Sequence, residues 1–439
     1  MSKAVAFYTL GCKVNQYDSQ AMLERFRAAG YQAVPFSAEA DVYVINTCTV
    51  TGVGDKKSLQ AARRIRREHP NSALVLCGCL AQRRGEALLA ETGATLVLGI
   101  RNRGQIVTLL EDTLRLGTPR CVTEPLTADT PYEPLTIARN DEHTRAVMKI
   151  QEGCNNHCTY CIIPSVRGPI RSRSLADIAL EARALAEAGY RELVLTGIHL
   201  TSYGRDLPGN TGLMDAIRTV HEVPGVERIR LGSLEPTLVT PAFMEALRTL
   251  PRLCPQFHLA LQAGSDAVLR RMARRYNMRM YMEAVRLLRE ANPLCAITTD
   301  ILTGFPGETE EEFRETCKAV RSIGFARIHV FPFSPREGTP AAAMPGQLTR
   351  EEKERRARRL IAIGEETARA YRQQWIGRTD TVLVETEAEG FWTGYTPAYV
   401  RVFLPAGPAV QAGRLYKVLL TAPHQDGLLG EVINEKKEG

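Results

Sequence analysis

Two long stretches of the chain alternate short apolar runs with amphipathic segments, and this alternation limits the possible folds more than any other feature. The first covers residues 1–120 and the second covers residues 144–347. The runs expected to be strands are 4–9, 41–45, 73–76 and 95–98 in the first stretch, and 147–151, 192–195, 228–231, 256–261, 296–302 and 327–331 in the second. Segments with helical periodicity fill the gaps. Because crossing helices join parallel strands, we expect an α/β protein with an N-terminal parallel-sheet domain and a partial, TIM-like barrel.

Three cysteines of the first stretch directly follow successive predicted strands. Cys12 follows the first strand, Cys48 the second and Cys79 the third. The carboxyl ends of parallel strands share one edge, where open α/β sheets bind ligands, so the topology should bring these thiols together. The alternative is three unrelated buried thiols, since free cysteine is often buried. Cys77 should point to the other face of its strand, and we expect it in the core.

The second stretch contains the motif C-x3-C-x2-C, formed by Cys154, Cys158 and Cys161 on a loop after the strand 147–151. Three thiolates on one short loop can converge on one metal centre. Structural zinc sites and ordinary ferredoxin clusters use four ligands, so this set is one short. A cubane held by three cysteines leaves one iron open to another ligand. A zinc loop or three unrelated core thiols are the alternatives.

Polar or small residues stand at the predicted strand ends of the second stretch. They are Gly197, Glu235, Gln262, Ser265 and Asp300. Glycine and serine permit close backbone approach, and Glu or Gln can hold ribose hydroxyls or an amino group. Polar strand ends and turns are common, which explains each residue singly. On one edge together, they indicate a nucleoside-like ligand.

The composition favours metal over disulfides. Eleven cysteines among 439 residues are many for an intracellular protein. We see no secretory signal before the first strand, and no apolar run reaches the roughly 18 residues that a membrane-spanning helix needs. We therefore expect a cytoplasmic protein without a membrane partner, in a reducing compartment where clustered cysteines indicate metal. A net charge of +7 permits a polyanionic partner without requiring one.

The remaining segments suggest contacts to nucleic acid. Residues 121–143 are expected to be a linker, and 348–375 a long basic helix that includes Arg355 and Arg359. That helix either contacts phosphates or is a solvated connector. Residues 376–439 contain short alternating strands typical of a small barrel. Its Phe391, Trp392 and Arg401 either stack on bases and clamp them or belong to the barrel core.

The three parts together resemble the radical S-adenosylmethionine (SAM) methylthiotransferase family over almost the whole chain. That family joins an N-terminal sheet domain, a radical SAM barrel and a C-terminal TRAM domain. The resemblance implies a 4Fe–4S cluster on Cys154, Cys158 and Cys161, with SAM on the open iron. Tyr160 stands where the family has an aromatic residue, which implies a place at the SAM site. A second 4Fe–4S cluster is implied on the other three cysteines, Cys12, Cys48 and Cys79.

The stretch Leu10-Gly-Cys-Lys-Val-Asn-Gln-Tyr-Asp18 resembles the members that act on threonylcarbamoyladenosine beside the tRNA anticodon. Members acting on isopentenyladenosine tend to show Gly-Cys-Gln-Met-Asn, and those acting on a ribosomal protein Gly-Cys-Pro-Lys-Asn. The segment 162–173 points the same way, and its Arg167, Arg171 and Arg173 are candidate RNA contacts. His157 and Ser165 depart from the usual Phe and Tyr beside the cluster.

The resemblance implies a tRNA-modifying transferase. Reductive cleavage of SAM would give a 5′-deoxyadenosyl radical, which removes hydrogen from carbon 2 of the adenine, and a methylthio group is delivered there. The implied partners are the tRNA anticodon loop and an electron donor such as flavodoxin or ferredoxin. The alternatives are a methylthiotransferase acting on isopentenyladenosine or on a ribosomal protein, and a non-enzymatic iron–sulfur protein that only binds RNA.

Overall fold

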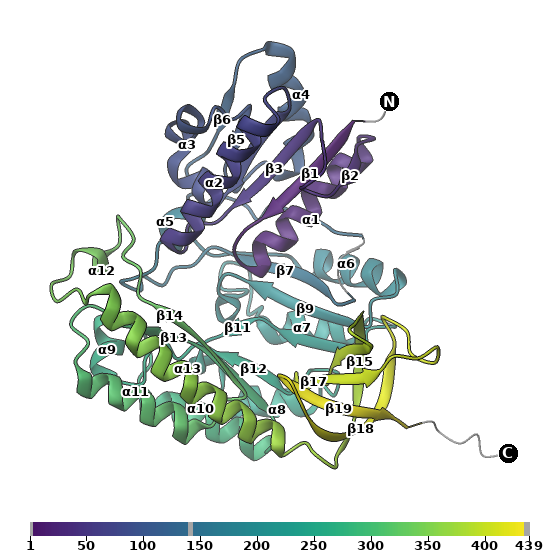
Figure 1. Cartoon of the computed structure of the whole chain (residues 1–439), viewed down its shortest axis with the longest axis vertical. Helices are drawn as coiled ribbons and strands as arrows, with labels where there is room; N and C mark the ends of the chain where they lie inside the picture. The colour runs from purple at the N-terminus through teal and green to yellow at the C-terminus, as the bar shows by residue number, and fades with distance from the viewer. Residues whose placement is uncertain (1–2, 139–143, 434–439) are drawn as a thin grey trace.

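The computed structural model describes residues 3–138 and 144–433, and its elements form three parts that follow one another along the chain (Figure 1). An N-terminal sheet domain stands above a curved α/β body, and a small barrel lies at one side of that body. The predicted α/β class, the partial barrel and the C-terminal all-β barrel are therefore confirmed.

The N-terminal domain is one six-stranded parallel sheet in the order β2-β1-β3-β4-β5-β6. Its strands are β1 (Ala4–Thr9), β2 (Gln32–Val34), β3 (Val42–Thr47), β4 (Ala73–Gly78), β5 (Leu96–Leu98) and β6 (Arg120–Val122). Its helices are α1 (Lys13–Ala28), α2 (Gly52–Glu68), α3 (Cys79–Thr92) and α4 (Ile106–Leu116). Apolar side chains of α2 and α3 pack on one face, and those of α1 and α4 on the other. Both faces are buried, as a parallel sheet requires.

The central body contains two four-stranded sheets, β10-β9-β7-β8 and β11-β12-β13-β14. The strands are β7 (Ala146–Glu152), β8 (Arg171–Ser172), β9 (Glu192–Gly197), β10 (Arg228–Leu231), β11 (Ser233–Leu234), β12 (Gln256–Leu259), β13 (Ala296–Thr303) and β14 (Arg327–Pro332). A bridge between Ile229 and Leu253 links the sheets. Because β8 and β14 end their sheets, the barrel stays open, as predicted.

Helices cover the outside of this body, except that α5 (Ile163–Arg167) lies between it and the N-terminal domain (Figure 1). The others are α6 (Leu175–Glu187), α7 (Leu213–His221), α8 (Pro241–Arg248), α9 (Asp266–Arg271), α10 (Met278–Ala291), α11 (Glu310–Ile323), α12 (Pro340–Ala343) and α13 (Arg350–Gln373). The long helix α13 begins at a Thr349 cap, whose side chain accepts the Glu352 N–H. It packs along α11 and β14, so it belongs to the central body.

The C-terminal part is a closed barrel in the order β15-β16-β17-β19-β18. Its strands are β15 (Thr379–Ala388), β16 (Phe391–Tyr395), β17 (Arg401–Pro405), β18 (Leu415–His424) and β19 (Gly427–Val432). Its apolar core continues into Tyr371 and Trp375 at the end of α13 and into Ala296 of β13. The barrel is therefore seated on the central body.

The segment expected to be a linker is packed against the protein. Residues 121 and 122 belong to β6, the edge strand of the N-terminal sheet. Further on, Leu135 and Ile137 are buried in the core of the central body. Residues 139–143 of the predicted linker lie outside the described part. No helix within the described residues is long and apolar enough to cross a membrane.

Candidate active site at the junction of the two α/β parts

The C-x3-C-x2-C loop leaves β7 through a turn that only glycine permits. Gly153 has φ 71°, and a Cβ there would lie 1.8 Å from the Pro169 carbonyl oxygen. The Cys154 N–H donates to the Gly168 carbonyl at 3.0 Å. Thr159 then ties the loop to α9, because its hydroxyl donates to the Arg271 carbonyl at 2.8 Å. The loop thus has a fixed conformation next to the barrel rim.

Two of the thiols in this loop accept hydrogen bonds. Arg274 Nη1 donates to Cys158 Sγ at 3.1 Å, and the Asn156 N–H donates to Cys154 Sγ at 3.4 Å. Burial raises the pKa of the Cys161 thiol to about 12. The metal-free loop therefore holds a protonated Cys161, and metal binding must displace its proton.

Glu235, which follows β11, lies beside this loop in a cluster of polar side chains. Asn156 follows β7, His199 follows β9 and Arg274 follows α9. Glu235 accepts from Arg274 Nη2 at 2.8 Å and from Asn156 Nδ2 at 3.2 Å, and it lies 3.2 Å from His199 Nε2. Burial opposes its charge, but hydrogen bonding to His199 and the charge of Arg274 lower the pKa of Glu235 below its ordinary value. The group presents an ionised carboxylate on the rim. Asn156, His199 and Arg274 had no sequence signal beyond their proximity to motifs.

Gly197 has a structural task at the end of β9. A Cβ at this position would lie 2.8 Å from both Cβ and Oε1 of Gln151. Gln151 Oε1 in turn accepts the His199 N–H at 2.7 Å. The glycine therefore makes room for a glutamine that orients the loop carrying His199.

The other residues predicted to bind the nucleoside lie on or near the same rim. Gln262 has φ 65°, and its backbone exchanges hydrogen bonds with β13. Ser265 caps α9, and its buried hydroxyl has no partner among the described residues. Tyr160 is partly buried against the central core. Asp300 lies inside β13 rather than after it, and it pairs with His258 Nε2 at 3.4 Å.

The second cysteine set lies at one edge of the N-terminal sheet. Cys12 precedes α1, Cys48 follows β3 and Cys79 begins α3, after three strands that are neighbours in the sheet. A Cβ on Gly11 would lie 3.0 Å from Cys48 Sγ, so the loop of Cys12 contacts Cys48. Burial raises the pKa of the Cys48 thiol to about 11. The topology thus brings together three thiols that are distant in sequence.

Cys77 is buried in the other apolar face of the sheet, as predicted. The predicted reason was wrong, since residues two apart on a strand share a face. Cys77 ends up apart from Cys79 because β4 ends at Gly78 and Cys79 belongs to α3. The change of element, rather than strand alternation, separates the two thiols.

Arg167 of α5 connects the two cysteine sets. Its Nε donates to Cys79 Sγ at 3.3 Å, Nη1 to Glu152 Oε1 at 2.5 Å and Nη2 to Asn15 Oδ1 at 2.5 Å. Cys79 also packs on Ile162, the residue directly after Cys161, and on Val166. The helix α5 therefore links the loop of the first set to Cys79 of the second.

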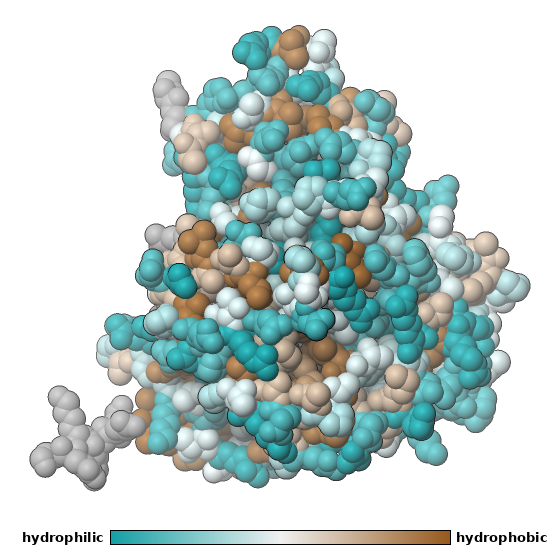
Figure 2. Space-filling model, turned by 180° about the vertical axis from the view of Figure 1, so that it is seen from behind, coloured by the Kyte–Doolittle hydropathy of each residue, from teal (hydrophilic) through white to brown (hydrophobic). Residues whose placement is uncertain are grey.

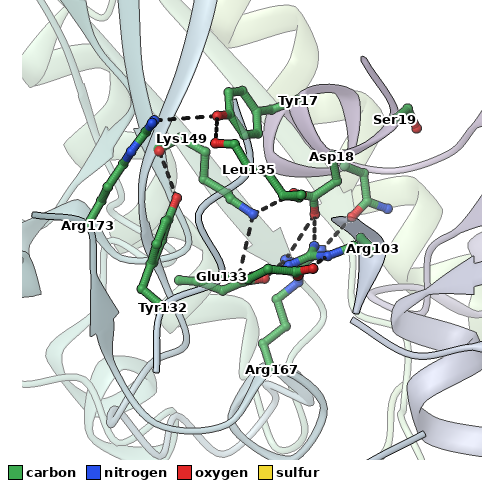
Figure 3. A network of polar contacts seen from close by, with 12 residues as sticks. Tyr17, Asp18, Ser19, Arg103, Tyr132, Glu133, Leu135, Lys149, Arg167 and Arg173 are labelled. Carbon is green, nitrogen blue, oxygen red and sulfur yellow. Dashed lines mark hydrogen bonds and ion pairs between the residues drawn. The ribbon is translucent and has the colours of Figure 1, made fainter. Parts of the chain in front are cut away.

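A buried ionic network surrounds this contact (Figure 3). Asp18 of α1 pairs with Arg103 and, at 2.5 Å, with Lys149 Nζ of β7. Arg103 also binds Glu133 at 2.9 Å and Glu152 at 3.1 Å. Asp18 and Arg103 belong to the N-terminal domain, whereas Lys149 and Glu152 belong to β7 of the central body. The bonds between them therefore join the two α/β parts. The network holds the two parts in one relative position.

Three predicted RNA contacts are corrected by this network. Arg167, Arg171 and Arg173 are buried, with at most 3% of each residue exposed. Arg173 pairs with the buried Glu181, and Arg171 Nη2 donates to the Arg167 carbonyl at 3.0 Å. These three arginines form internal contacts where the N-terminal domain joins the central body, so their side chains are not accessible to RNA.

The remaining RNA candidates lie on α13 and on the C-terminal barrel. Arg355 and Arg359 are exposed but paired with Glu310. Phe391 packs on Phe403 and His424, and Trp392 packs against the barrel core. Arg401 is one-third exposed and pairs with Asp426. Trp392 thus contributes to the barrel core, while Phe391 and Arg401 are both partly exposed.

A hollow of about 510 Å³ lies between α13, β14 and the barrel, and it contains further arginines. Its cationic residues are Arg327, Arg369, Arg372 and Arg401. Seen from behind, the molecule is mostly hydrophilic, with apolar side chains in small groups (Figure 2). Within the described residues, no group of three His, Cys, Asp or Glu side chains is arranged to hold a single metal ion.

Two family models match the chain, and three curated relatives match nearly its whole length. The Radical SAM superfamily matches residues 148–320, and Uncharacterized protein family UPF0004 matches residues 4–99. Relatives named threonylcarbamoyladenosine tRNA methylthiotransferase MtaB come from Bacillus subtilis (39% identity, 98% of this chain, 97% of the relative) and Thermotoga maritima (36%, 91%, 91%). A third comes from Chlamydia pneumoniae (32%, 97%, 97%). The chain belongs to the threonylcarbamoyladenosine tRNA methylthiotransferase family.

Solved structures support the fold of this methylthiotransferase family member. The radical SAM methyltransferase TsrM from Kitasatospora setae has a TM-score of 0.58 at 16% identity, over 78% of this chain and 77% of that chain. The cobalamin-dependent radical SAM enzyme OxsB has a TM-score of 0.50 at 11% identity, over 84% and 56%. The matched radical SAM region contains Cys154, Cys158 and Cys161, and an iron–sulfur cluster and SAM follow from the family.

Proposed function

We propose that the protein is a transferase that places a methylthio group on carbon 2 of N6-threonylcarbamoyladenosine next to the tRNA anticodon. The observation that carries this proposal is that α5, which follows the first cysteine set, contacts Cys79 of the second set, in a chain whose relatives bear that activity in their names. Arg167 donates to Cys79, and Cys79 packs on Ile162, the residue after Cys161. Both contacts involve the segment that directly follows the first cysteine set. A substrate atom between the two sets would be reachable from both.

The residues present suit two clusters of the 4Fe–4S type and SAM. Each set offers three thiols, and each has a buried or nearly buried arginine donating to one sulfur, Arg274 for Cys158 and Arg167 for Cys79. When bound, the groups would supply reductive cleavage of SAM at the first set and the sulfur to be inserted at the second. The protein supplies position, charge and exclusion of water.

Residues on the rim can hold SAM in a fixed orientation. The Glu235 carboxylate can accept from an amino group, and Asn156 beside it is a donor within the same cluster. The Ser265 hydroxyl is buried with an unused hydrogen-bonding capacity. Tyr160, between Cys158 and Cys161, is the aromatic residue that would contact SAM beside the cluster.

The tRNA would bind over α13 and the C-terminal barrel. The arginines in the hollow between them can neutralise phosphates, which makes binding salt-dependent. Phe391, partly exposed beside the hydrophilic surface, and Arg401 are suited to unstacked bases of an anticodon loop. A reductant such as flavodoxin or ferredoxin completes the proposed system.

The test is anaerobic reconstitution with iron and sulfide, followed by reaction with SAM, a reductant and tRNA carrying N6-threonylcarbamoyladenosine. The native protein should hold about eight irons and form the 2-methylthio nucleoside, detected by mass spectrometry. Cys12→Ala/Cys48→Ala/Cys79→Ala should hold about four irons and form 5′-deoxyadenosine without methylthio product. Dithionite and reduced flavodoxin or ferredoxin are compared as electron sources.

Cys77→Ala is the matched control, because this thiol lies in the core and outside both sets. It should keep about eight irons and the product. Eight irons in the triple variant would contradict a second cluster at these cysteines. Product from tRNA carrying isopentenyladenosine, and none from threonylcarbamoyladenosine, would contradict the proposed substrate.

A further inference from the structure

A cavity of about 450 Å³ lies where the N-terminal domain, the central body and the C-terminal barrel meet. Lys13 and Gln16 of α1 line it from the first part, Arg145 from the segment before β7, and Glu385 and Tyr399 from the C-terminal barrel. Lys13 directly follows Cys12, so one wall of the cavity begins next to the second cysteine set, although no cysteine lines the cavity. All three parts of the chain are needed to form it.

Lys13 lines this cavity and forms no ion pair with any residue that the structure describes. Among the described residues, no carboxylate oxygen lies within 4.0 Å of its ammonium group. The neighbouring arginines each have one: Arg145 Nε lies 2.5 Å from Glu385 Oε1, and Arg230 Nε lies 2.6 Å from Glu192 Oε1. Tyr399, Arg145, Arg230 and Glu192 all lie close enough to act electrostatically on Lys13. The wall of the cavity therefore carries surplus positive charge, which favours an anionic ligand.

Tyr399 gives a second indication that this cavity binds a ligand. Its backbone has φ 63°, a strained conformation for a large aromatic residue. Its ring lies 5.2 Å from the Arg145 guanidinium carbon and 4.7 Å from that of Arg230, and it stacks on Tyr395. The surrounding contacts thus hold a strained tyrosine in place at the wall of the cavity.

We propose that Lys13 binds the carboxylate of the threonyl substituent on the adenosine and thereby selects an anionic substrate; this rests on the proposed function. Positions 2 and 6 of the purine ring flank the same ring nitrogen, so a substituent on N6 projects beside the carbon that receives sulfur. Lys13 is bonded to Cys12, a ligand of the proposed sulfur-bearing cluster, so its side chain begins beside that cluster and extends to the cavity. An ammonium–carboxylate hydrogen bond is among the stronger polar contacts in proteins.

The test compares two anticodon stem–loop RNAs that differ in one group. One carries N6-threonylcarbamoyladenosine and the other its threonine methyl ester, which removes the negative charge. Dissociation constants are measured with the reconstituted full-length protein at moderate salt. The native protein should bind the acid about ten- to a hundredfold more tightly than the ester, as expected for one charged hydrogen bond.

Three variants separate the role of the charge from damage to the site. Lys13→Gln should bring the acid-to-ester ratio close to one, and Lys13→Arg should keep most of it. Lys318→Gln, at an exposed position on α11, should behave as the native protein. Iron and sulfide contents of all variants are measured first, so that a lost cluster is recognised.

Equal binding of acid and ester by the native protein overturns the proposal, as does an unchanged ratio in Lys13→Gln with full iron content. Failure of the proposed function gives a different result. The native protein would then form no methylthio product from tRNA carrying N6-threonylcarbamoyladenosine, whatever the two affinities are.

Discussion

Arg167 is the residue that links α5, which follows the first cysteine set, directly to Cys79 of the second set. It is fully buried, and its guanidinium spends its donors on Cys79, Glu152 and Asn15. Arg167→Gln leaves the buried Glu152 short of one cation and Cys79 without its donor. Removing one partner of a buried ion pair costs about 3–5 kcal/mol, so we expect a clear fall in unfolding temperature.

The reduction potential separates this role from a merely structural one. Hydrogen bonds and positive charge near a cluster sulfur favour the reduced, more negative state. A potentiometric titration followed by electron paramagnetic resonance should therefore show a lower potential for the second cluster in Arg167→Gln, and less change in Arg167→Lys. Arg218→Gln, exposed on α7, is the control. An unchanged potential with full iron would leave Arg167 a stabilising residue only.

At the scale of the element, arginines of β10 hold the C-terminal barrel on the central body. Arg228 Nη1 donates to the Tyr395 carbonyl at 3.0 Å, and Arg230 Nη1 to the Pro397 carbonyl at 2.9 Å. Deleting the barrel would uncover these buried arginines and the apolar face around Trp375. Truncation therefore disturbs the central body, and point substitutions in the hollow are the cleaner test of RNA binding.

Arg369→Gln/Arg372→Gln should weaken tRNA binding while SAM cleavage continues. Each lost phosphate contact reduces the slope of log affinity against log salt by about one. The measurement is tRNA affinity at several salt concentrations, with 5′-deoxyadenosine formation as the second readout. Arg248→Gln, an exposed arginine of α8, is the matched control. An unchanged slope in the double variant would remove the hollow from the RNA surface.

How accurately the sequence predicts a helix or strand depends on the length of that element and on its position in the sheet. The long helix α13, expected over 348–375, was predicted within two residues at each end, because its helical pattern continues over many turns. The short strands β2 and β6 were missed, since three residues at a sheet edge carry almost no periodicity. Motif cysteines were identifiable from chain position. Arg167 was misassigned because its partners Asn15 and Cys79 are far away in sequence.

At the scale of the whole molecule, Glu192 helps to join the central body to the C-terminal barrel. It is buried and binds Arg230, with Arg228 and Arg145 at 3.7 and 3.9 Å. Arg228 and Arg230 donate to barrel carbonyls, and Arg145 pairs with Glu385 of the barrel. One carboxylate thus supports three arginines that contact the other part.

This arrangement predicts an acid-sensitive junction. Burial opposes ionisation, but Arg230, Arg145 and Arg228 lower the pKa of Glu192 below its ordinary value. Because the pKa is lower in the folded state, the carboxylate stabilises the protein above its unfolded pKa of about 4.3. This contribution is lost as the pH falls through and below that value. The unfolding temperature of the native protein should therefore decline on acidification.

Glu192→Gln should start at a lower unfolding temperature near neutral pH, because three buried arginines lose their carboxylate. It should then decline less steeply with acid, since the group that titrates is gone. Unfolding temperatures of both proteins measured from neutral pH to about pH 2, below the unfolded pKa of the carboxyl, test this, with the exposed Glu245→Gln as control. Parallel curves for the native protein and Glu192→Gln would show that the junction does not depend on this charge, and the acid sensitivity would have to come from other carboxylates.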